Sequence, residues 1–352
     1  MRYVSLFIFS CILLSCKKEK AEPKVSNPPI SQSGMLVLCE GLFQQNNTTL
    51  SWVNLEDGTV ENQYFLNQNG RLLGDTGNDM VEYGDKVYIV VNVSSTIEVL
   101  DKQTLESIKQ IDMKSNGVPK SPRKIKFHEG FGYITCFDGY VDVLDTNNLS
   151  IIARIKVGEN PEDLTFANGK MYVSNSGGLN VPDVDSTVSV VNLSTNEELK
   201  KITVGPNPGG IVTDLEGEVY VISRGNYGSL PSRMVRLNSD LDEVEETFPF
   251  NASGITKMDE NFLIRYTDFN ALSSSINLFD PLTETIVQSD FIDMNQFTTL
   301  YGLYYDSKNE KVVGTDAMNY TNSGYLKVFS KLGVFEKSYH VGLNPNSIVF
   351  YE

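Results

Sequence analysis

Residues 157–203 read VGENPEDLTFANGKMYVSNSGGLNVPDVDSTVSVVNLSTNEELKKIT. The stretch contains four short β-rich segments, which are separated by turns of Gly, Asn, Asp and Ser. The segments are NPEDLTF (160–166), KMYVSN (170–175), SVVN (189–192) and ELKKIT (198–203). No amphipathic pattern of ten or more residues, which would indicate a helix, occurs in this stretch or elsewhere. The pattern therefore predicts one antiparallel sheet of four strands.

The third segment of this unit recurs through the chain. Its seven copies each close on a polar residue, at Asn54, Asp101, Asp145, Asn192, Asn238, Asp280 and Ser330. The intervals between them are 42 to 50 residues. Four strands in each 40 to 50 residues, repeated along a chain, are typical of a β-propeller. We therefore predict an all-β fold, a seven-bladed β-propeller with four-stranded antiparallel blades.

The two ends of the chain predict how the ring closes. The last segment, NPNSIVFYE (344–352), resembles a first strand that has no partners after it. The first segments, MLVLCEG (35–41), TLSWVN (49–54) and VENQYF (60–65), supply strands two to four without a first strand. Together they make one blade, in which the C-terminal strand joins the N-terminal blade. An open solenoid or two β-sandwiches remain alternatives, although neither explains this truncated first repeat.

The N-terminus predicts export and lipidation. Arg2 precedes an apolar run from Tyr3 to Leu14, which is too short to span a bilayer. The sequence Leu13-Leu14-Ser15-Cys16 resembles a bacterial lipobox, in which the cysteine is acylated. We expect a lipoprotein signal peptide at 1–15, a lipid-anchored flexible tether at 16–33 and the propeller at 34–352. A cleaved soluble protein with an incidental Cys16 is the alternative.

The charge balance and the scarcity of reactive residues exclude several functions. With 29 Lys and Arg against 45 Asp and Glu, the 352 residues carry a formal net charge of −16, which disfavours nucleic acid as a partner. The two histidines, His128 and His340, lie in separate repeats, and no catalytic or metal-binding motif surrounds them. We expect no cofactor, no metal and no enzyme activity. Cys39 and Cys136 lie two repeats apart, so we expect two free, buried thiols.

The repeats also carry a family resemblance. Its clearest motifs are GRLLGDTGNDM (70–80), VGENPEDLTF (157–166), MYVSNSGGL (171–179) and VISRGNYG (221–228). The chain resembles YVTN/YncE-like propellers and, more closely, the β-propeller lipoproteins of Bacteroidota surface-uptake systems, which include BtuG-type vitamin B12-capturing lipoproteins. The resemblance implies capture of a small-molecule nutrient, with cobalamin the best single choice, for a TonB-dependent outer-membrane transporter. It implies a place at the cell outer membrane and surface through the lipid anchor only, although exposure to the periplasm stays open.

The loop lengths predict which face of the propeller binds the ligand. The loops between second and third strands (for example 176–187 and 224–233), together with the connections between blades, are longer and richer in aromatic and amide residues than the hairpin turns on the other face. Such residues combine stacking area with directed hydrogen bonds. The candidate ligand-binding residues are Glu40, Phe43, Asn78, Arg123, Phe137, Arg224, Asn226, Tyr227, Tyr266, Asp268, Phe269, Tyr301, Asp316, Tyr320 and Asn344.

Two other functions remain open from the sequence. The same face could dock a protein, which would make the chain an interaction scaffold in the cell envelope. A metal-dependent propeller hydrolase is the second alternative, although its metal and acid–base residues are not evident in the sequence. Some candidates also have a structural explanation. Asn160, Asn207 and Asn344 each precede a proline, where an asparagine side chain commonly caps a turn.

Overall fold

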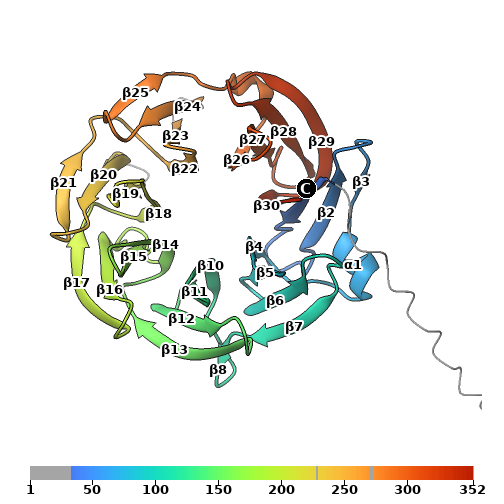
Figure 1. Cartoon of the computed structure of the whole chain (residues 1–352), viewed down its shortest axis with the longest axis horizontal. Helices are drawn as coiled ribbons and strands as arrows, with labels where there is room; N and C mark the ends of the chain where they lie inside the picture. Colours follow the sequence, from blue (N-terminus) through green and yellow to red (C-terminus); the bar gives the residue numbers. More distant parts are fainter. Residues whose placement is uncertain (1–32, 227–228, 269–272, 352) are drawn as a thin grey trace, which may run out of the picture.

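The computed structural model describes residues 33–226, 229–268 and 273–351. Over these residues the chain forms seven four-stranded antiparallel sheets, which stand around a central axis as the blades of a propeller (Figure 1). The predicted seven-bladed all-β fold is therefore confirmed. The predicted signal peptide, the lipidation site Cys16 and the tether as far as residue 32 lie outside the described residues.

Blades 1 to 4 are described from the axis outward. Blade 1 consists of β30 (Pro345–Tyr351), β1 (Gly34–Cys39), β2 (Thr49–Asn54) and β3 (Val60–Glu61). Blade 2 consists of β4 (Gly77–Tyr83), β5 (Lys86–Val91), β6 (Thr96–Asp101) and β7 (Ser107–Asp112). Blade 3 consists of β10 (Pro122–His128), β11 (Phe131–Cys136), β12 (Tyr140–Asp145) and β13 (Ser150–Lys156). Blade 4 consists of β14 (Pro161–Ala167), β15 (Lys170–Asn175), β16 (Thr187–Asn192) and β17 (Glu197–Thr203).

Blades 5 to 7 follow the same order. Blade 5 consists of β18 (Pro208–Thr213), β19 (Val219–Ser223), β20 (Arg233–Asn238) and β21 (Glu243–Thr247). Blade 6 consists of β22 (Gly254–Met258), β23 (Asn261–Asp268), β24 (Ser273–Asp280) and β25 (Thr285–Gln288). Blade 7 consists of β26 (Leu300–Asp306), β27 (Lys311–Asp316), β28 (Ser323–Ser330) and β29 (Phe335–Leu343).

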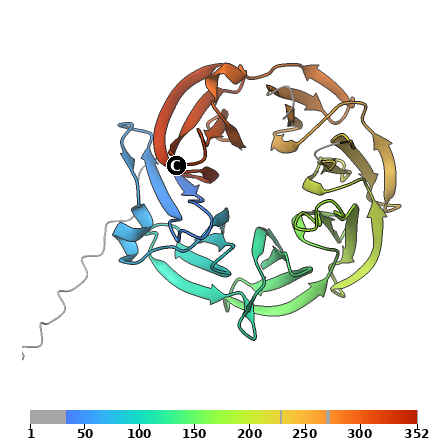
Figure 2. The ribbon, with the colours of Figure 1, turned by 180° about the vertical axis from the view of Figure 1, so that it is seen from behind.

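The chain ends close the ring as predicted. β30 pairs antiparallel with β1, from Gly34 opposite Tyr351 to Cys39 opposite Pro345. The red C-terminal strand therefore lies beside the blue N-terminal strands (Figure 2). This pairing gives β1 a hydrogen-bonding partner on each side, so blade 1 has no unpaired inner edge.

The hydrophobic core lies between the blades. Seven clusters of buried apolar side chains fill the seven interfaces between neighbouring sheets. Alternate residues of one strand serve two clusters, because side chains along a strand point to opposite faces. In β5, for example, Val87 and Ile89 pack toward blade 1, while Tyr88 and Val90 pack toward blade 3. Both faces of β5 are buried, which explains its nearly continuous apolar sequence KVYIVV.

A left-handed residue precedes the inner strand in at least five blades. Thr76, Ser121, Asn160, Asn207 and Asn344 have φ between 43° and 62°, a conformation that asparagine tolerates better than most residues. Each of their carbonyl groups accepts a hydrogen bond from the first residue of the loop that follows the second strand, over 2.8 to 3.1 Å. The same turn therefore fixes both the start of the inner strand and the root of the neighbouring loop.

Two connections depart from the regular pattern. The fourth strand predicted for the first blade ends early, because Gln63 is left-handed (φ 61°) and the chain then forms the short helix α1 (Tyr64–Asn69). Phe65 of this helix is buried in the cluster between blades 1 and 2. Between blades 2 and 3 a small hairpin, β8 (Lys114–Ser115) with β9 (Val118–Pro119), projects from the ring. No helix in the described part of the chain has the length and apolar character needed to cross a membrane.

The two thiols behave as the repeat spacing predicts. Cys39 ends β1 in blade 1 and Cys136 ends β11 in blade 3, and both are buried and unpaired. Burial raises the pKa of Cys39 to about 11, so this thiol stays protonated at neutral pH.

Removal of residues 343–352 is expected to destabilise the whole ring. The deletion takes away Ile348, Val349 and Tyr351 from the clusters on both sides of blade 1 and leaves β1 with an exposed edge. Three buried side chains at about 2 kcal/mol each correspond to a fall in melting temperature of about 10 °C or more in a domain of this size. Calorimetry or circular dichroism measures the change.

The matched control replaces the β8–β9 hairpin, residues 114–119, by two glycines. This hairpin is exposed, and its base is closed by the Lys120 N–H donating to the Met113 carbonyl over 3.1 Å. The control protein should melt close to the wild type. An unchanged melting temperature after removal of 343–352 would contradict closure by the C-terminal strand.

Candidate functional site

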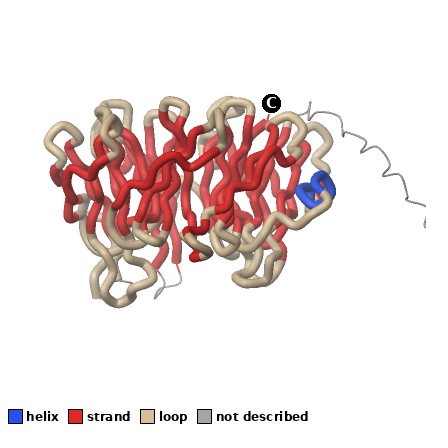
Figure 3. The backbone as a smooth tube through the Cα atoms, turned by 90° about the horizontal axis from the view of Figure 1, so that it is seen from below, coloured by secondary structure: helices blue, strands red, loops and turns tan. Residues whose placement is uncertain are grey.

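The two faces of the propeller differ in their loops. Seen from the side, one face carries short turns and the other carries larger loops (Figure 3). The short turns join first to second and third to fourth strands, as between β4 and β5 or β14 and β15. We call this the hairpin face. The long-loop face carries the connections between second and third strands and those between blades, as the sequence predicts.

Six inner strands contain one extra residue near the long-loop face. The register between first and second strands shifts at this point in blades 1, 2, 3, 4, 5 and 7. Such a bulge turns a side chain out of the regular alternation of the sheet. The residues after the first position of these strands are Asn346, Asn78, Arg123, Glu162, Gly209 and Tyr301. Most are polar, and they lie at equivalent places around the axis.

Hydrogen bonds and ion pairs join most of these residues and their neighbours in two runs. One run leads from Asn78 through Arg123 and Glu162 to Arg224, and the other leads from Arg265 through Tyr301 and Glu40 to Asn346. We call the group the polar belt, and it consists of Glu40, Asn78, Arg123, Glu162, Arg224, Arg265, Tyr301 and Asn346.

Arg123 makes several of the contacts that join the polar belt. Its Nη1 donates to Asn78 Oδ1 over 2.5 Å, and its Nη2 donates to Glu162 Oε1 over 2.8 Å. The Asn78 amide returns a hydrogen bond to the Arg123 carbonyl over 2.7 Å. The guanidinium carbon lies 4.6 Å from the centre of the Phe137 ring, a cation–π distance. Arg123 is therefore positioned by three blades.

Glu162 links Arg123 to Arg224. Its Oε1 lies 3.6 Å from Arg224 Nη2, which is longer than the bond to Arg123. Burial opposes ionisation of this carboxyl, but the charges of Arg123 and Arg224 outweigh it and lower the pKa of Glu162 to about 2. Glu162 is therefore a carboxylate at every physiological pH.

On the other side of the ring, Glu40 joins blades 1 and 7. The Tyr301 hydroxyl donates a short hydrogen bond to Glu40 Oε2. The Asn346 amide lies 3.4 Å from the same oxygen and donates to the Gly77 carbonyl over 2.7 Å. Burial, with the Glu40 charge beside it, raises the pKa of Tyr301 above its usual value, so the phenol remains a hydrogen-bond donor.

Glycines make room for the other two arginines. A Cβ atom at Gly209 would lie 2.4 Å from Arg224 Cζ, so the guanidinium occupies the space that a side chain at this bulge would fill. A Cβ atom at Gly254 would lie 3.1 Å from Arg265 Nε. Arg265 donates through Nη1 to the Tyr301 carbonyl over 2.9 Å. Both guanidinium groups therefore lie close against an inner strand.

A cavity of about 830 Å³ opens beside these two arginines. It lies on the long-loop face between blades 5, 6 and 7, and we call it the arginine cavity. Its lining combines the two guanidinium groups with aromatic rings and hydroxyl groups. The principal side chains are Arg224, Ser232, Arg265, Tyr266, Thr267, Asp268, Phe297, Thr299, Tyr301 and Tyr320. This mixture of aromatic area with a few directed polar groups is typical of a small-molecule site.

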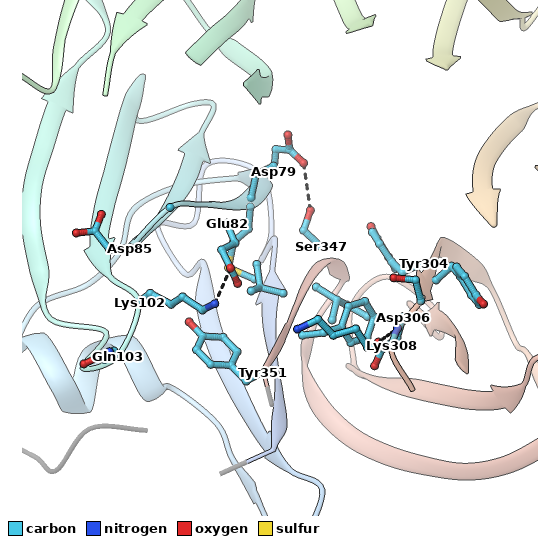
Figure 4. Close-up of a pocket in the computed structure, with 18 of the residues that line it drawn as sticks. Asp79, Glu82, Asp85, Lys102, Gln103, Tyr304, Asp306, Lys308, Ser347 and Tyr351 are labelled. Atoms are coloured by element: carbon cyan, nitrogen blue, oxygen red, sulfur yellow. Dashed lines mark hydrogen bonds and ion pairs between the residues drawn. The ribbon is translucent and has the colours of Figure 1, made fainter. Parts of the chain in front are cut away.

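A larger cavity, of about 1190 Å³, lies nearer the hairpin face between blades 7, 1 and 2 (Figure 4). Much of its wall is the inner strand β30 and the adjoining part of β4. Its charged groups largely satisfy each other. Lys102 bonds Glu82 over 2.6 Å, and the Asp79 carboxylate, which bonds Lys124 over 3.0 Å, is also directed to Ser347 (Figure 4). None of the candidate residues predicted from the sequence lines it, and we consider it a weaker site.

The structure brings nine of the fifteen predicted ligand-binding residues to the polar belt and the arginine cavity. Arg224, Tyr266, Asp268, Tyr301 and Tyr320 line the cavity. Glu40, Asn78 and Arg123 belong to the belt, and Phe137 lies against Arg123.

Four other predicted residues lie outside that site. Asp316 is buried, and its carboxylate accepts hydrogen bonds from the backbone of Thr298, Thr299 and Met318. Asn344 is buried in its turn, where its amide donates to the Gly41 carbonyl. Both therefore hold loops in place. Asn226 bonds within its own loop, and Phe43 is exposed on another. Tyr227 and Phe269 lie outside the described residues.

Sequence reasoning missed three members of the polar belt, namely Glu162, Arg265 and Asn346. Glu162 and Asn346 directly follow Pro161 and Pro345, in the position that Arg123 takes after Pro122. Comparison of this single position across the repeats would have found them. Arg265 stands in a second strand opposite Gly254, which leaves room beside its guanidinium group. Among the described residues, no group of three or more His, Cys, Asp or Glu is arranged to hold a metal ion.

Comparisons with known proteins agree with this fold. The model of a family described as "Domain of unknown function (DUF5074)" matches residues 33–255. No curated protein sequence matches the chain significantly.

Several solved structures share the architecture. A quinonprotein alcohol dehydrogenase-like protein from Bacteroides thetaiotaomicron has 15% identity and a TM-score of 0.66, over 92% of this chain and 79% of that chain. A functionally unknown protein from Desulfotomaculum acetoxidans has 13% identity and a TM-score of 0.65, over 91% of this chain and 99% of that chain. Hydrazine synthase from Kuenenia stuttgartiensis has 14% identity and a TM-score of 0.63, over 77% of this chain and 88% of that chain. At such identities the likeness shows the fold alone.

Glu162→Gln is expected to remove a pH-dependent part of the stability. The folded pKa of about 2 lies below the ordinary value of 4.5, so the Glu162 charge stabilises the fold fully above about pH 5. This contribution is lost as the pH falls from there toward 2. We compare the free energies of unfolding of the wild type and of Glu162→Gln. The advantage of the wild type should become smaller by about 3 kcal/mol when the pH is lowered from 6 to 2.

Urea unfolding at several pH values measures this difference. Glu260→Gln, at an exposed turn on the hairpin face, is the matched control, and its difference from wild type should stay nearly constant. A constant difference for Glu162→Gln as well would show that the two arginines do not hold this carboxylate.

Proposed function

The chain belongs to the DUF5074 family, and we propose that it is a binding protein for a small-molecule nutrient. In this proposal a lipid on Cys16 anchors it to the outer membrane, and it passes its ligand to a TonB-dependent transporter. The observation that carries the proposal is the arginine cavity, where three tyrosines and two arginines from three blades surround about 830 Å³. That volume falls within the usual range for sites that enclose most of a small organic molecule.

Binding, and not catalysis, is the role that we propose for this cavity. Neither histidine lines it, because His128 ends β10 near the hairpin face and His340 lies in the outer strand β29. The cavity hydroxyls therefore have no imidazole base beside them among the described residues. Its guanidinium donors, hydroxyl groups and aromatic rings suit recognition of a polar, partly planar ligand.

Cobalamin is the specific ligand that we propose first, because the repeat motifs resemble those of vitamin B12-capturing surface lipoproteins. The rest of the polar belt adjoins the arginine cavity and offers amide and guanidinium groups around the axis. A ligand larger than the cavity could therefore extend across the belt. A protein that binds a corrinoid becomes pink and retains cobalt after incubation and desalting.

A second candidate function is supported by the loop tips of the same face. Phe43, Leu179 and Val181 are 67%, 72% and 62% exposed there. Apolar side chains at loop tips are suited to contact with another protein. An interaction scaffold would capture a protein partner and retain no small molecule from a mixture of vitamins and cofactors.

Capture is expected to depend on the cavity tyrosines. The double variant Tyr266→Ala/Tyr320→Ala removes two aromatic rings from the cavity lining. Each ring that packs on the ligand contributes about 2 kcal/mol to the binding free energy. The affinity for cobalamin should fall about a thousandfold. Calorimetric titration measures it, with the melting temperature checked in parallel.

The matched control is Phe131→Ala with Phe335→Ala. These two rings are 37% and 39% exposed, and they lie on β11 at the hairpin face and on the outer strand β29. The control pair should change the affinity by less than about threefold. Equal losses from both pairs, in folded proteins, would exclude the arginine cavity as the capture site.

Cys16→Ala is expected to release the protein from the membrane. A diacylated cysteine supplies two chains, which anchor stably, whereas one chain anchors only marginally. Fractionation of cells should find the variant in the soluble fraction and the wild type in the outer membrane. Lys17→Ala, which keeps the cysteine, is the control. A Cys16→Ala protein that stayed in the outer-membrane fraction would contradict the anchor.

A further inference from the structure

The arginine cavity carries a surplus of positive charge in a strongly acidic protein. Two of its lining residues, Arg224 and Arg265, are cationic, and one, Asp268, is anionic. The whole chain has a formal net charge of −16. A local excess of cations against that background requires an explanation, because partly buried charges are costly unless they are paired.

The nearby carboxylate is already used by another arginine. Glu162 accepts the 2.8 Å hydrogen bond from Arg123 and lies 3.6 Å from Arg224. The bond to Arg123 is direct, whereas the distance to Arg224 exceeds that of a hydrogen bond. Most N–H donors of the Arg224 guanidinium group are therefore not hydrogen-bonded to Glu162.

Arg265 has still fewer partners. Within the described part of the chain, its guanidinium forms one hydrogen bond, to the Tyr301 carbonyl, and no ion pair with a carboxylate. A guanidinium has five N–H donors, so most of this group remains available. Burial and the neighbouring charge of Arg224 both lower the pKa of Arg265, because two cations side by side repel each other.

The cavity wall leaves room for both guanidinium groups. A Cβ atom at Gly209 would displace Arg224, and one at Gly254 would crowd Arg265 Nε at 3.1 Å. Beside them the Ser232 hydroxyl is buried and has no hydrogen-bond partner in the described structure. This hydroxyl therefore keeps an unused donor and acceptor in the cavity wall. Fork-shaped guanidinium donors with a hydroxyl nearby match the oxygens of a carboxylate or a phosphate.

We propose that the arginine cavity binds the anionic group of its ligand, a carboxylate or a phosphate, between Arg224 and Arg265. The aromatic rings of Tyr266, Tyr301 and Tyr320 line the rest of the cavity and receive the planar, less polar part of the same molecule. This inference rests on the proposed binding function and adds the chemical class of the group that the site recognises.

The test uses three small probes that share one ring. Phenyl phosphate and benzoate carry the two kinds of anion, and phenol is the neutral comparison. Calorimetric titration of the wild type should give at least one anion that binds at least tenfold more tightly than phenol and weakens as salt is added. The better of the two anions identifies the group as a phosphate or a carboxylate.

Three variants examine the arginines. Arg265→Gln and Arg224→Gln should each weaken the preferred anion at least tenfold and leave phenol nearly unchanged. Gly209→Ala keeps every charge but places a Cβ atom 2.4 Å from Arg224 Cζ, so the guanidinium must move and the anion should bind less tightly. Lys200→Gln, on the outer strand β17, is the control for loss of one positive charge and should change the affinity by less than threefold.

The outcomes separate this inference from the proposed function. The anion assignment is overturned if neither anion is preferred over phenol, or if folded Arg224→Gln and Arg265→Gln proteins bind the anion as the wild type does. Arg265→Lys, which keeps the charge, is available should Arg265→Gln fail to fold, and it should bind more weakly than the wild type. The cobalamin titration of the tyrosine variants tests the capture function independently, because it needs no arginine substitution.

Discussion

The pairing of β30 with β1 is the constraint on which the rest of the structure depends. Every hydrophobic cluster lies between two blades, so no blade has a complete core of its own. A ring of such units buries all of its faces only when the last interface is also formed. The C-terminal residues form that interface, since Ile348 faces blade 7 while Val349 and Tyr351 face blade 2. Closure therefore sets the spacing of all seven inner strands.

That spacing in turn determines the polar belt. Equivalent bulges bring one residue of each of six inner strands to the same height around the axis. The backbone at this height is nearly constant, whereas the side chains differ from blade to blade. Arginine, glutamate, asparagine, tyrosine and glycine occupy equivalent positions. Every blade contributes at least one residue to the polar belt, and the same residues join neighbouring blades to each other.

The architecture could be predicted from the sequence because its causes repeat. Seven copies of one strand motif and an incomplete first repeat indicate both the blade number and the closure, and the structure has both. The helix α1 escaped prediction because a single left-handed residue, Gln63, ends the expected strand. The site was harder to predict, since a ligand-binding residue and a turn-forming residue look alike in one sequence. Asp316 illustrates the difficulty, because its carboxylate serves the backbone of a neighbouring connection. Arg265 is the opposite case, a cavity residue that the sequence does not reveal. Its place in the cavity wall becomes evident only when the sheet pairs it with Gly254.

Amide hydrogen exchange with and without ligand tests the central claim, that the arginine cavity is the binding site, most directly. Cobalamin and phenyl phosphate, each at a saturating concentration, are the two ligands to compare with the free protein. The expected result is added protection in peptides that cover 253–268, 294–301 and 317–325, around the cavity on the long-loop face. Peptides that cover 79–85 and 304–308, around the larger cavity near the hairpin face, should exchange as before. Protection of those peptides instead, or no protection around the arginine cavity, would contradict the assignment.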